Sequence, residues 1–571
     1  MLFFSLFSIS LALWLVYPRA VATEHLASGR TKAVDLPWVF WEVSNGNQLS
    51  VHLPVHGVTP RRFNITPDDR LTALSVNGQS VPLGGIPDSS LTDWRHGFEI
   101  DLSPWLHNGD NTIDFTVDNY LLGGGIVLHP LPGWQRLLLA AGLLPWLLLL
   151  RRWFALSRPQ LLVLSAAVLV LSFYWAATPW TLHNYDVMHQ NDSGHYGYIR
   201  YVLAHLSLPR PDQGWEYYQP PLYYMVAALA CRWAEWFGLA EAETLQALAL
   251  LFWLVFLAAS AATLRLALRR SPQGIVLATA ALALWPSGVI HAIRIGNEPA
   301  FYAGAAVATW FMFRWWRGNK RRHLAGMALS IAAALLCKAT AGVLAVAAVL
   351  LIALRVVRRG GRPRAVADAA IAAVILAGGA VLSAARGLYY WSRNEISDVL
   401  IGNIGGLAQD TGLHVSNRFR DYIPLDLPVF LTSPWVDSRD DATGRNNYWN
   451  FFLRSSLSAE FSFDGAMQRV IALAWGGILL LLLLSLAARL SELRYPLRAF
   501  WRDLPWPLLA LLWLVSSLSV RINYPFSSCS DFRFVLPLLL PFLIACARGR
   551  RLPQLLLLGL SLSSAVFFLG L

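Results

Sequence analysis

Asp192 lies in a segment whose residue types suit proton transfer or cation binding, 185-YDVMHQNDSGHYGYIRYVLAHLSLPRPDQGWEYYQPPLYY. It follows the apolar stretch 160–178 and stands at the start of an amphipathic helix, with His195 three and Tyr196 four positions further on. These spacings put the three side chains on one helix face. A carboxylate there could accept a proton from a hydroxyl or hold a divalent cation. The alternative is that the Asn-Asp-Ser run only caps the helix, because these residue types are favoured N-caps.

A second group of polar residues lies in the sequence HAIRIGNEPAFY, which begins at His291 and separates two further apolar stretches. Asn297 could cap the next helix, with Pro299 in its first turn. Capping accounts for those two residues only. It gives no reason for His291, Arg294 and Glu298 to come together at one membrane boundary.

The composition indicates that a lipid bilayer surrounds these segments. Of the 571 residues, 56% are hydrophobic and 14% are charged, which is far from the average of soluble proteins. The net charge of +12 comes from short basic runs between apolar stretches. A nucleic-acid partner is excluded because it would need these charges on a folded polar face, and such runs are typical of cytoplasmic loops. The four cysteines have no metal-ligand spacing, so neither a zinc site nor a disulfide framework is predicted.

About thirteen apolar stretches approach the roughly 20 residues that a transmembrane helix needs. With the N-terminus inside, they alternate so that every strongly basic gap falls in the cytoplasm, and three sizeable segments fall outside. We therefore predict a mainly α, polytopic protein with outer segments 19–133, 179–242 and 385–467. The spans are 2–18, 134–150, 160–178, 243–264, 273–290, 299–315, 324–337, 340–354, 366–384, 468–488, 505–520, 533–546 and 552–570.

Two apolar stretches, 324–354 and 220–238, do not fit a single transmembrane helix. Both flanks of 324–354 are basic, so the chain must cross twice and Lys338 marks the outer turn. The first half, with about 14 residues, is only about 21 Å long, so Lys338 could lie below the outer surface and line a cavity. The stretch 220–238 contains Arg232 and Glu235, and we interpret it as an interfacial or re-entrant helix.

The N-terminal part of the chain has a different pattern. Residues 1–22 are expected to form an uncleaved membrane anchor and 134–150 a connecting transmembrane helix. Between them, 35–128 shows alternating apolar and polar residues with Asn-Gly and Gly-Asp turns, which predicts a small extracytoplasmic β-sandwich. It resembles the jelly-roll domains that often bind sugars. A spacer or partner-docking role is the alternative, because such sandwiches host many functions.

The order of features in 160–571 resembles a known family. An apolar span is followed by an outer acidic residue, an aromatic helix, and the sequence Gln-Pro-Pro-Leu-Tyr-Tyr that opens a second helix. This pattern resembles the GT-C superfamily of polyprenol-dependent glycosyltransferases, in particular the branch of protein mannosyltransferases and aminoarabinose transferases (glycosyltransferase family 39). The β-sandwich and its two flanking spans fall outside the resemblance.

The resemblance implies roles for individual residues. Asp192 matches the acidic residue of the family's first outer loop, which acts as a base or organises a metal, and Asp186 is the alternative. Glu298 matches the second acidic position. The other implied groups are donor-phosphate ligands at Arg294, Lys338 and Arg533, and substrate-binding residues at His195, Tyr196, Gln219 and Asn297.

The cationic residues could also have purely structural roles. Arg294 and Lys338 could extend to lipid headgroups, and Arg533 could form an internal ion pair with Asp531. The sequence has Asp-Ser and Asn-Glu where many relatives have Asp-Glu and an Asp. A divalent cation, Mg²⁺ or Mn²⁺, held by Asp192 and Glu298 is therefore left open.

The predicted function is that of a multi-pass glycosyltransferase, hexosyl or pentosyl, of the cell (inner) membrane with its active site facing the periplasm or exterior. It would transfer a sugar from a polyprenyl-phosphate carrier to a hydroxyl of a glycan, lipid or protein acceptor. One rival is a transporter or flippase of lipid-linked sugars, and the other is a non-catalytic subunit of cell-envelope assembly. Transporters tend to place ionisable groups near the midplane and to show paired repeats, whereas here these groups gather at the outer boundary.

Overall fold

The computed structural model of the protein describes residues 2–34, 36, 38–40, 42–94, 96–120, 124–180, 194–358, 361–403, 411–490, 501–548 and 551–571. Asp192 and its alternative Asp186 lie outside the described residues. The chain divides into two compact units, which are described separately below. The first comprises Met1–Trp146, Ser172–Leu182 and Ala230–Leu245, and the second comprises Leu147–Leu171, His183–Leu229 and Gln246–Leu571. The domain boundaries expected from the sequence stay a prediction.

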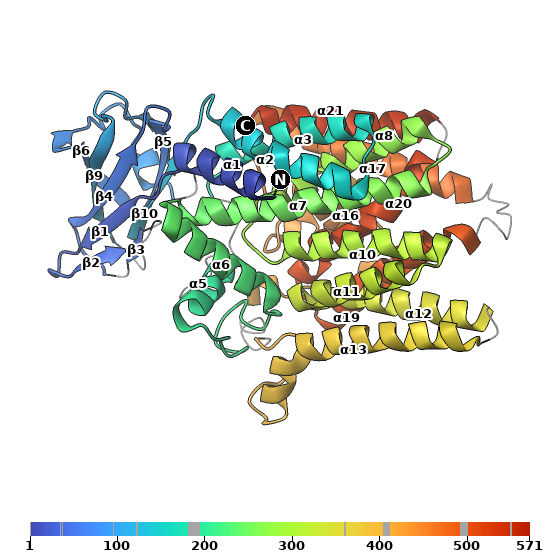
Figure 1. Ribbon diagram of the computed structural model, residues 1–571. Helices are drawn as coiled ribbons and strands as arrows, with labels where there is room; N and C mark the ends of the chain where they lie inside the picture. The colour runs from blue at the N-terminus through green and yellow to red at the C-terminus, as the bar shows by residue number, and fades with distance from the viewer. Residues whose placement is uncertain are drawn as a thin grey trace. The chain divides into compact units, whose positions relative to one another are not determined.

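The first unit contains the predicted β-sandwich (Figure 1). Its described strands form two antiparallel sheets, with the orders β2-β1-β4-β9-β6-β7 and β3-β10-β5-β8. The strands are β1 (Val21–His25), β2 (Thr31–Val34), β3 (Trp38–Phe40), β4 (Asn47–Val55), β5 (Arg62–Asp68), β6 (Arg70–Val76), β7 (Gln79–Ser80), β8 (Phe98–Asp101), β9 (Gly109–Asp118) and β10 (Gly124–Pro130).

The alternating sequence pattern places the core of the sandwich between its sheets. Leu49 and Val51 on β4 are buried, and the residues between the buried positions of this strand are more exposed, as expected for side chains that alternate between two faces. Apolar side chains from strands of both sheets join the same cluster. Asn77 and Gly78 form the predicted hairpin turn between β6 and β7, with φ of 52° and 77°, as a type I′ turn requires.

His129 on β10 is a buried titratable group of the first unit, with only 2% of its surface exposed. Its Nε2 lies 3.4 Å from the carbonyl oxygen of Ala176, and its Nδ1 has no hydrogen-bond partner among the described residues. Burial lowers the pKa of His129 to about 4, because a charged imidazole would lose its hydration there. The folded protein therefore keeps His129 neutral at neutral pH.

We expect acid to destabilise the protein through His129. In the unfolded chain its pKa is about 6.5, so the unfolded state binds a proton before the folded state does. The stability present above about pH 6.5 is then lost as the pH falls toward 4, by up to about 3 kcal/mol. Thermal unfolding of the full-length protein in detergent between pH 7 and 4.5 measures this loss. His129→Phe should flatten the pH dependence, whereas the exposed-site control His107→Phe should retain it; equal slopes in all three proteins would contradict the assignment.

The helices agree with the predicted mainly α, membrane-spanning class. Within the described ranges, nine helices are long and apolar enough to cross a membrane, and the bent pair α8 and α9, which meet at 52°, makes a tenth if it is one span. Three other predicted spans are shorter or more polar helices, α1, α10 and α11, so the count of about thirteen stays a prediction.

The described helices are α1 (Leu2–Val16), α2 (Arg136–Phe154), α3 (Arg158–Ala177), α5 (His195–His205), α6 (Leu222–Phe237), α7 (Glu241–Ala267), α8 (Pro272–Ala283), α9 (Pro286–Ala292), α10 (Glu298–Gly318), α11 (Arg321–Cys337), α12 (Gly342–Arg358), α13 (Pro363–Trp391), α15 (Leu427–Thr432), α16 (Tyr448–Ser458), α17 (Ala466–Leu490), α19 (Pro505–Asn523), α20 (Leu539–Ala547) and α21 (Arg551–Leu569).

In the second unit, α10, α11, α12 and α13 lie side by side (Figure 1). The stretch 324–354 is broken where the sequence predicts a turn, because Lys338 is extended (φ −156°, ψ 131°) between α11 and the short turn that precedes α12. Small residues let α10 and α11 approach closely. A Cβ added at Gly304 on α10 would come within 3.0 Å of the Cβ of Ala334 on α11, a spacing typical of small-residue contacts between membrane helices.

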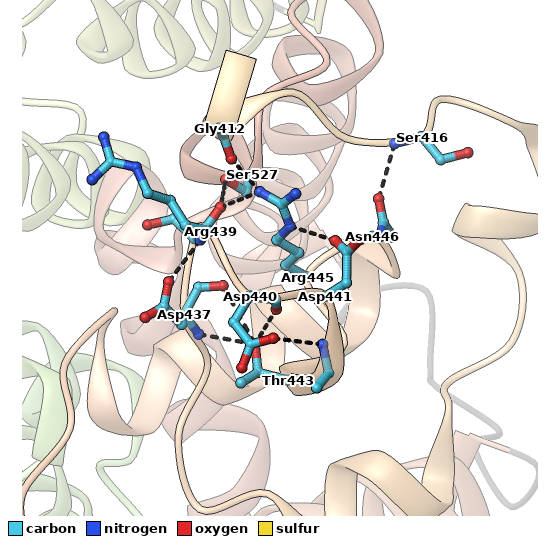
Figure 2. Close-up of polar contacts among 12 residues, drawn as sticks. Gly412, Ser416, Asp437, Arg439, Asp440, Asp441, Thr443, Arg445, Asn446 and Ser527 are labelled. Carbon is cyan, nitrogen blue, oxygen red and sulfur yellow. Dashed lines mark hydrogen bonds and ion pairs between the residues drawn. The ribbon is translucent and has the colours of Figure 1, made fainter. Parts of the chain in front are cut away.

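The described part of the predicted outer segment 385–467 contains one well-packed helix, α16, and longer stretches that are exposed. The helix α16 is almost wholly buried. Figure 2 shows how Arg445 ties the preceding turn together: its guanidinium donates to the carbonyl oxygens of Gly412 and Ser438 and to the carboxylate of Asp441. Ser527 donates to the same Ser438 carbonyl at 2.7 Å, which fixes this segment against the residues that precede Asp531.

Candidate active site

Glu298 and Lys338 form a buried ion pair at the junction of three helices in the second unit. Glu298 is the first residue of α10, and Lys338 lies between α11 and α12. The Lys338 Nζ lies 2.6 Å from the Glu298 Oε1, and the side chains are 5% and 6% exposed. Two groups distant in the sequence thus meet as predicted, but Lys338 is neutralised by Glu298 instead of standing alone.

A chain of amide hydrogen bonds extends from this pair to the loop before α6. Asn297 donates through Nδ2 to the Gln219 Oε1 at 3.1 Å and to the Cys337 carbonyl at 2.9 Å. Gln219 in turn donates to the Glu216 carboxylate at 3.0 Å. Asn297 shows no side-chain cap on α10, so its amide positions neighbouring segments and the capping interpretation is wrong for its side chain.

His195 begins α5 and has polar neighbours at both ring nitrogens. Its Nδ1 lies 2.8 Å from the hydroxyl of Tyr224 on α6, and its Nε2 lies 3.9 Å from the Glu216 carboxylate. Burial raises the pKa of Tyr224 well above its usual value, so the hydroxyl keeps its proton. His195 thus links α6 to the loop that carries Glu216.

The two arginines predicted at this boundary also lie near Glu298. Both Arg533 and Arg294, together with Lys338 and His195, act electrostatically on its carboxylate. Arg533 forms the ion pair with Asp531 that the sequence offered as the alternative, with 3.2 Å between Nε and Oδ2. Its carbonyl accepts a hydrogen bond of 2.6 Å from Tyr302 on α10.

Arg294 and Lys338 also contact aromatic rings. The Arg294 guanidinium lies 5.4 Å from the ring centre of Phe461, and the Lys338 ammonium lies 5.0 Å from that of Phe534. Arg294 is 4% exposed and Lys338 is 4% exposed, so extension to lipid headgroups does not describe either side chain. Several cations thus gather, mostly desolvated, around one carboxylate.

Comparisons with known proteins give structural similarity only. No family model and no curated protein matches the chain. Solved structures of ArnT from Cupriavidus metallidurans are similar over 66% of this chain and 71% of theirs, one bound to undecaprenyl phosphate (15% identity, TM-score 0.28) and one in the apo state (16%, 0.30). Arabinosyltransferase EmbB from Mycobacterium smegmatis is similar over 100% of this chain and 62% of its own length, with 12% identity and a TM-score of 0.30.

With every TM-score below 0.5, the chemistry proposed below rests on the geometry of this site. The chain spans less than two thirds of the length of EmbB.

Not every residue assigned by the GT-C resemblance has a described contact in this cluster. Tyr196 is buried and stacks with Arg200 on its own helix, with 5.2 Å between guanidinium and ring centre. Two contributors were missed by the sequence analysis, Glu216 and Tyr224. Both occur in the quoted segment WEYYQPPLYY, three residues before and five residues after Gln219, and their polar type next to an assigned residue was the available signal.

The described residues do not fit a divalent cation. Lys338, His195, Arg533 and Arg294 act electrostatically on the Glu298 carboxylate, whereas Mg²⁺ and Mn²⁺ require several oxygen ligands. In the ranges that the structure covers, no three His, Cys, Asp or Glu side chains converge on one point. We therefore derive no step through a metal ion.

Gly296→Ala is expected to disturb the cluster without adding or removing a charge. A Cβ at this position would lie 2.8 Å from the Glu298 Oε2 and 3.3 Å from the His195 Nε2. The carboxylate is held by Lys338, so it must shift, and overpacking of this kind costs about 1–3 kcal/mol. Donor binding and thermal stability should both fall. Gly477→Ala, whose new Cβ would meet no atom within 4 Å, is the control; unchanged behaviour of Gly296→Ala would show that the packing is looser than described.

Proposed function

We propose that this protein is a membrane glycosyltransferase that moves a sugar from a polyprenyl-phosphate carrier to an acceptor hydroxyl at the outer side of the cell (inner) membrane. The observation that supports this most is the gathering of Lys338, Arg533 and Arg294 around Glu298 at the ends of apolar helices. A phosphate attached to a lipid reaches such a place from the bilayer. Cations there bind it by charge-assisted hydrogen bonds.

In the proposed reaction, the acceptor oxygen attacks the anomeric carbon and the carrier phosphate leaves from the opposite face. Asp192 takes the proton of the acceptor hydroxyl as the oxygen–carbon bond forms. Lys338, Arg533 and Arg294 stabilise the charge that develops on the leaving phosphate oxygen. The anomeric configuration is inverted, because one displacement occurs.

Glu298 has a positioning role in this scheme. Without donor, its carboxylate holds the Lys338 ammonium at 2.6 Å. A donor phosphate would share this ammonium with Glu298 and provide the anionic partner that Arg533 otherwise finds in Asp531. His195, Gln219 and Asn297 hold the surrounding segments in place through their hydrogen bonds to one another's neighbours and so position the sugar site.

The test is to incubate purified protein in nanodiscs with a panel of polyprenyl-phosphate sugars and candidate acceptors, with and without chelator. We expect release of polyprenyl phosphate and formation of a glycosylated product with one donor, and no effect of the chelator. Loss of activity with the chelator would restore the metal-dependent alternative. Movement of the intact donor across vesicles without product would replace the proposal by a flippase, and neither transfer nor movement would favour a non-catalytic subunit.

A further inference from the structure

A charged cavity lies at the end of α10 opposite to Glu298. It has a volume of about 630 Å³ and is lined by Arg269, Trp316, Arg317, Arg355, Arg358, Trp501 and Arg502. α10 begins at Glu298 and ends at Gly318, so at 1.5 Å per residue the cavity is about 30 Å from the ion pair described above. This distance matches the hydrocarbon thickness of a bilayer, which places the two sites at opposite membrane faces.

Arginines from four separate segments converge on this cavity. One follows α7, one ends α10, two end α12, and one precedes α19. The Arg355 Nη1 donates to the carbonyl of Trp316 at 2.6 Å, and Arg358 covers the ring of Trp501 at 3.9 Å. Trp316 donates to the Trp501 carbonyl at 2.8 Å, which joins two of these segments.

Among the described residues, one carboxylate lies next to the cavity, that of Asp503. The lining contains no described carboxylate, and the neighbouring Asp503 is shared by three arginines at 3.0–3.4 Å: Arg317, Arg502 and Arg548. The like charges of Arg269, Arg502 and Arg548 repel the Arg317 guanidinium. Its buried Nε has no hydrogen-bond partner among the described residues.

These features exceed what membrane topology requires. A basic loop orients a membrane protein wherever its charges lie along that loop, and it needs neither a cavity nor a buried donor. Basic pockets between transmembrane helices are suited to phosphate-bearing lipid headgroups. Tryptophan rings at the membrane–water boundary place such a pocket at the depth of the headgroups.

We propose that this arginine cavity binds the phosphate headgroup of an anionic lipid from the leaflet opposite the candidate active site. The arginines supply charge-assisted hydrogen bonds to the phosphate oxygens, and the apolar helix surfaces below them accommodate the acyl chains. A free phosphate offers the same chemistry to the arginines but lacks these chains. The experiment below therefore separates the two sources.

The experiment measures binding of phosphatidylglycerol to the full-length protein in detergent by native mass spectrometry, with phosphatidylcholine and inorganic pyrophosphate as comparison ligands. The test variant is Arg269→Gln/Arg358→Gln, which removes two exposed lining charges. The matched control is Arg362→Gln/Arg364→Gln, which removes two exposed charges at the start of α13 outside the lining. Near a membrane surface each arginine contributes about 1 kcal/mol, so the test variant should bind phosphatidylglycerol about 30-fold more weakly.

The expected result is tight phosphatidylglycerol binding that the test variant loses and the control retains. Equal binding of phosphatidylcholine would overturn the proposal, as would equal losses in the two variants, since these would show a general charge effect. Pyrophosphate binding as tight as that of the lipid would overturn the assignment to a lipid headgroup.

Discussion

Lys338→Met lowers the free energy of unfolding by about 3–5 kcal/mol and abolishes sugar transfer, if the buried ion pair has the part proposed here. The variant leaves the Glu298 carboxylate without the ammonium that lies 2.6 Å away, and an unpaired buried charge is strongly destabilising. Transfer is lost because the leaving phosphate has no ammonium to stabilise it. Denaturant unfolding in mixed micelles, followed by tryptophan fluorescence, measures the first effect, and the transfer assay measures the second.

The double variant Lys338→Met/Glu298→Gln separates these effects. It removes both charges, so much of the stability should return while activity does not. Lys320→Met is the control, because this exposed lysine precedes the opposite end of α11 and its loss should change neither quantity. A double variant as unstable as Lys338→Met would show that the stability does not depend on the pairing.

Asp192→Asn is expected to reduce the rate of transfer by about 10²- to 10⁴-fold, the usual contribution of a general base. The change keeps the size of the side chain and removes its ability to take a proton. Donor binding should persist, because the phosphate ligands are untouched. Single-turnover transfer and equilibrium binding of the donor, measured on the same preparation, separate chemistry from binding.

Asp186→Asn is the matched comparison, since Asp186 is the rival for this position. If Asp186→Asn loses transfer and Asp192→Asn keeps it, the assignment of the base is reversed. If both variants keep full activity, the acidic residue of this segment has no catalytic role. A helix cap at Asp192 would instead predict little change in either stability or the rate of transfer, because asparagine and aspartate cap helices about equally well.

The class of the fold could be predicted because its signals are local. Apolar length indicated the spanning helices, and strict alternation with Asn-Gly turns indicated the sandwich, whose Asn77 and Gly78 adopt the expected positive φ. The break at Lys338 followed from the basic flanks on both sides of 324–354. The stretches 299–315 and 324–337 were also predicted as spans, but the helices that contain them, α10 and α11, are shorter or more polar than the spans found among the described residues.

The site was only partly predictable, because it depends on contacts between distant segments. The family resemblance indicated Glu298 and Arg533, and the outer turn predicted within 324–354 indicated Lys338. Which cation meets which carboxylate is decided by packing. The pair of Arg533 with Asp531 was one of the alternatives open from the sequence, whereas no local pattern indicated the pair of Lys338 with Glu298. Glu216 and Tyr224 were missed for the same reason, since their partners lie on other elements.

The close approach of Gly304 and Ala334 affects how precisely the Glu298 carboxylate and the Lys338 ammonium are positioned. Gly304 lies six residues beyond Glu298, and Ala334 lies four residues before Lys338, so this contact is within about two helical turns of both charges. A methyl group inserted between the backbones would spread the helices just beneath the carboxylate and the ammonium. Two residues with no functional group of their own thus set the tolerance within which the charged ones can meet.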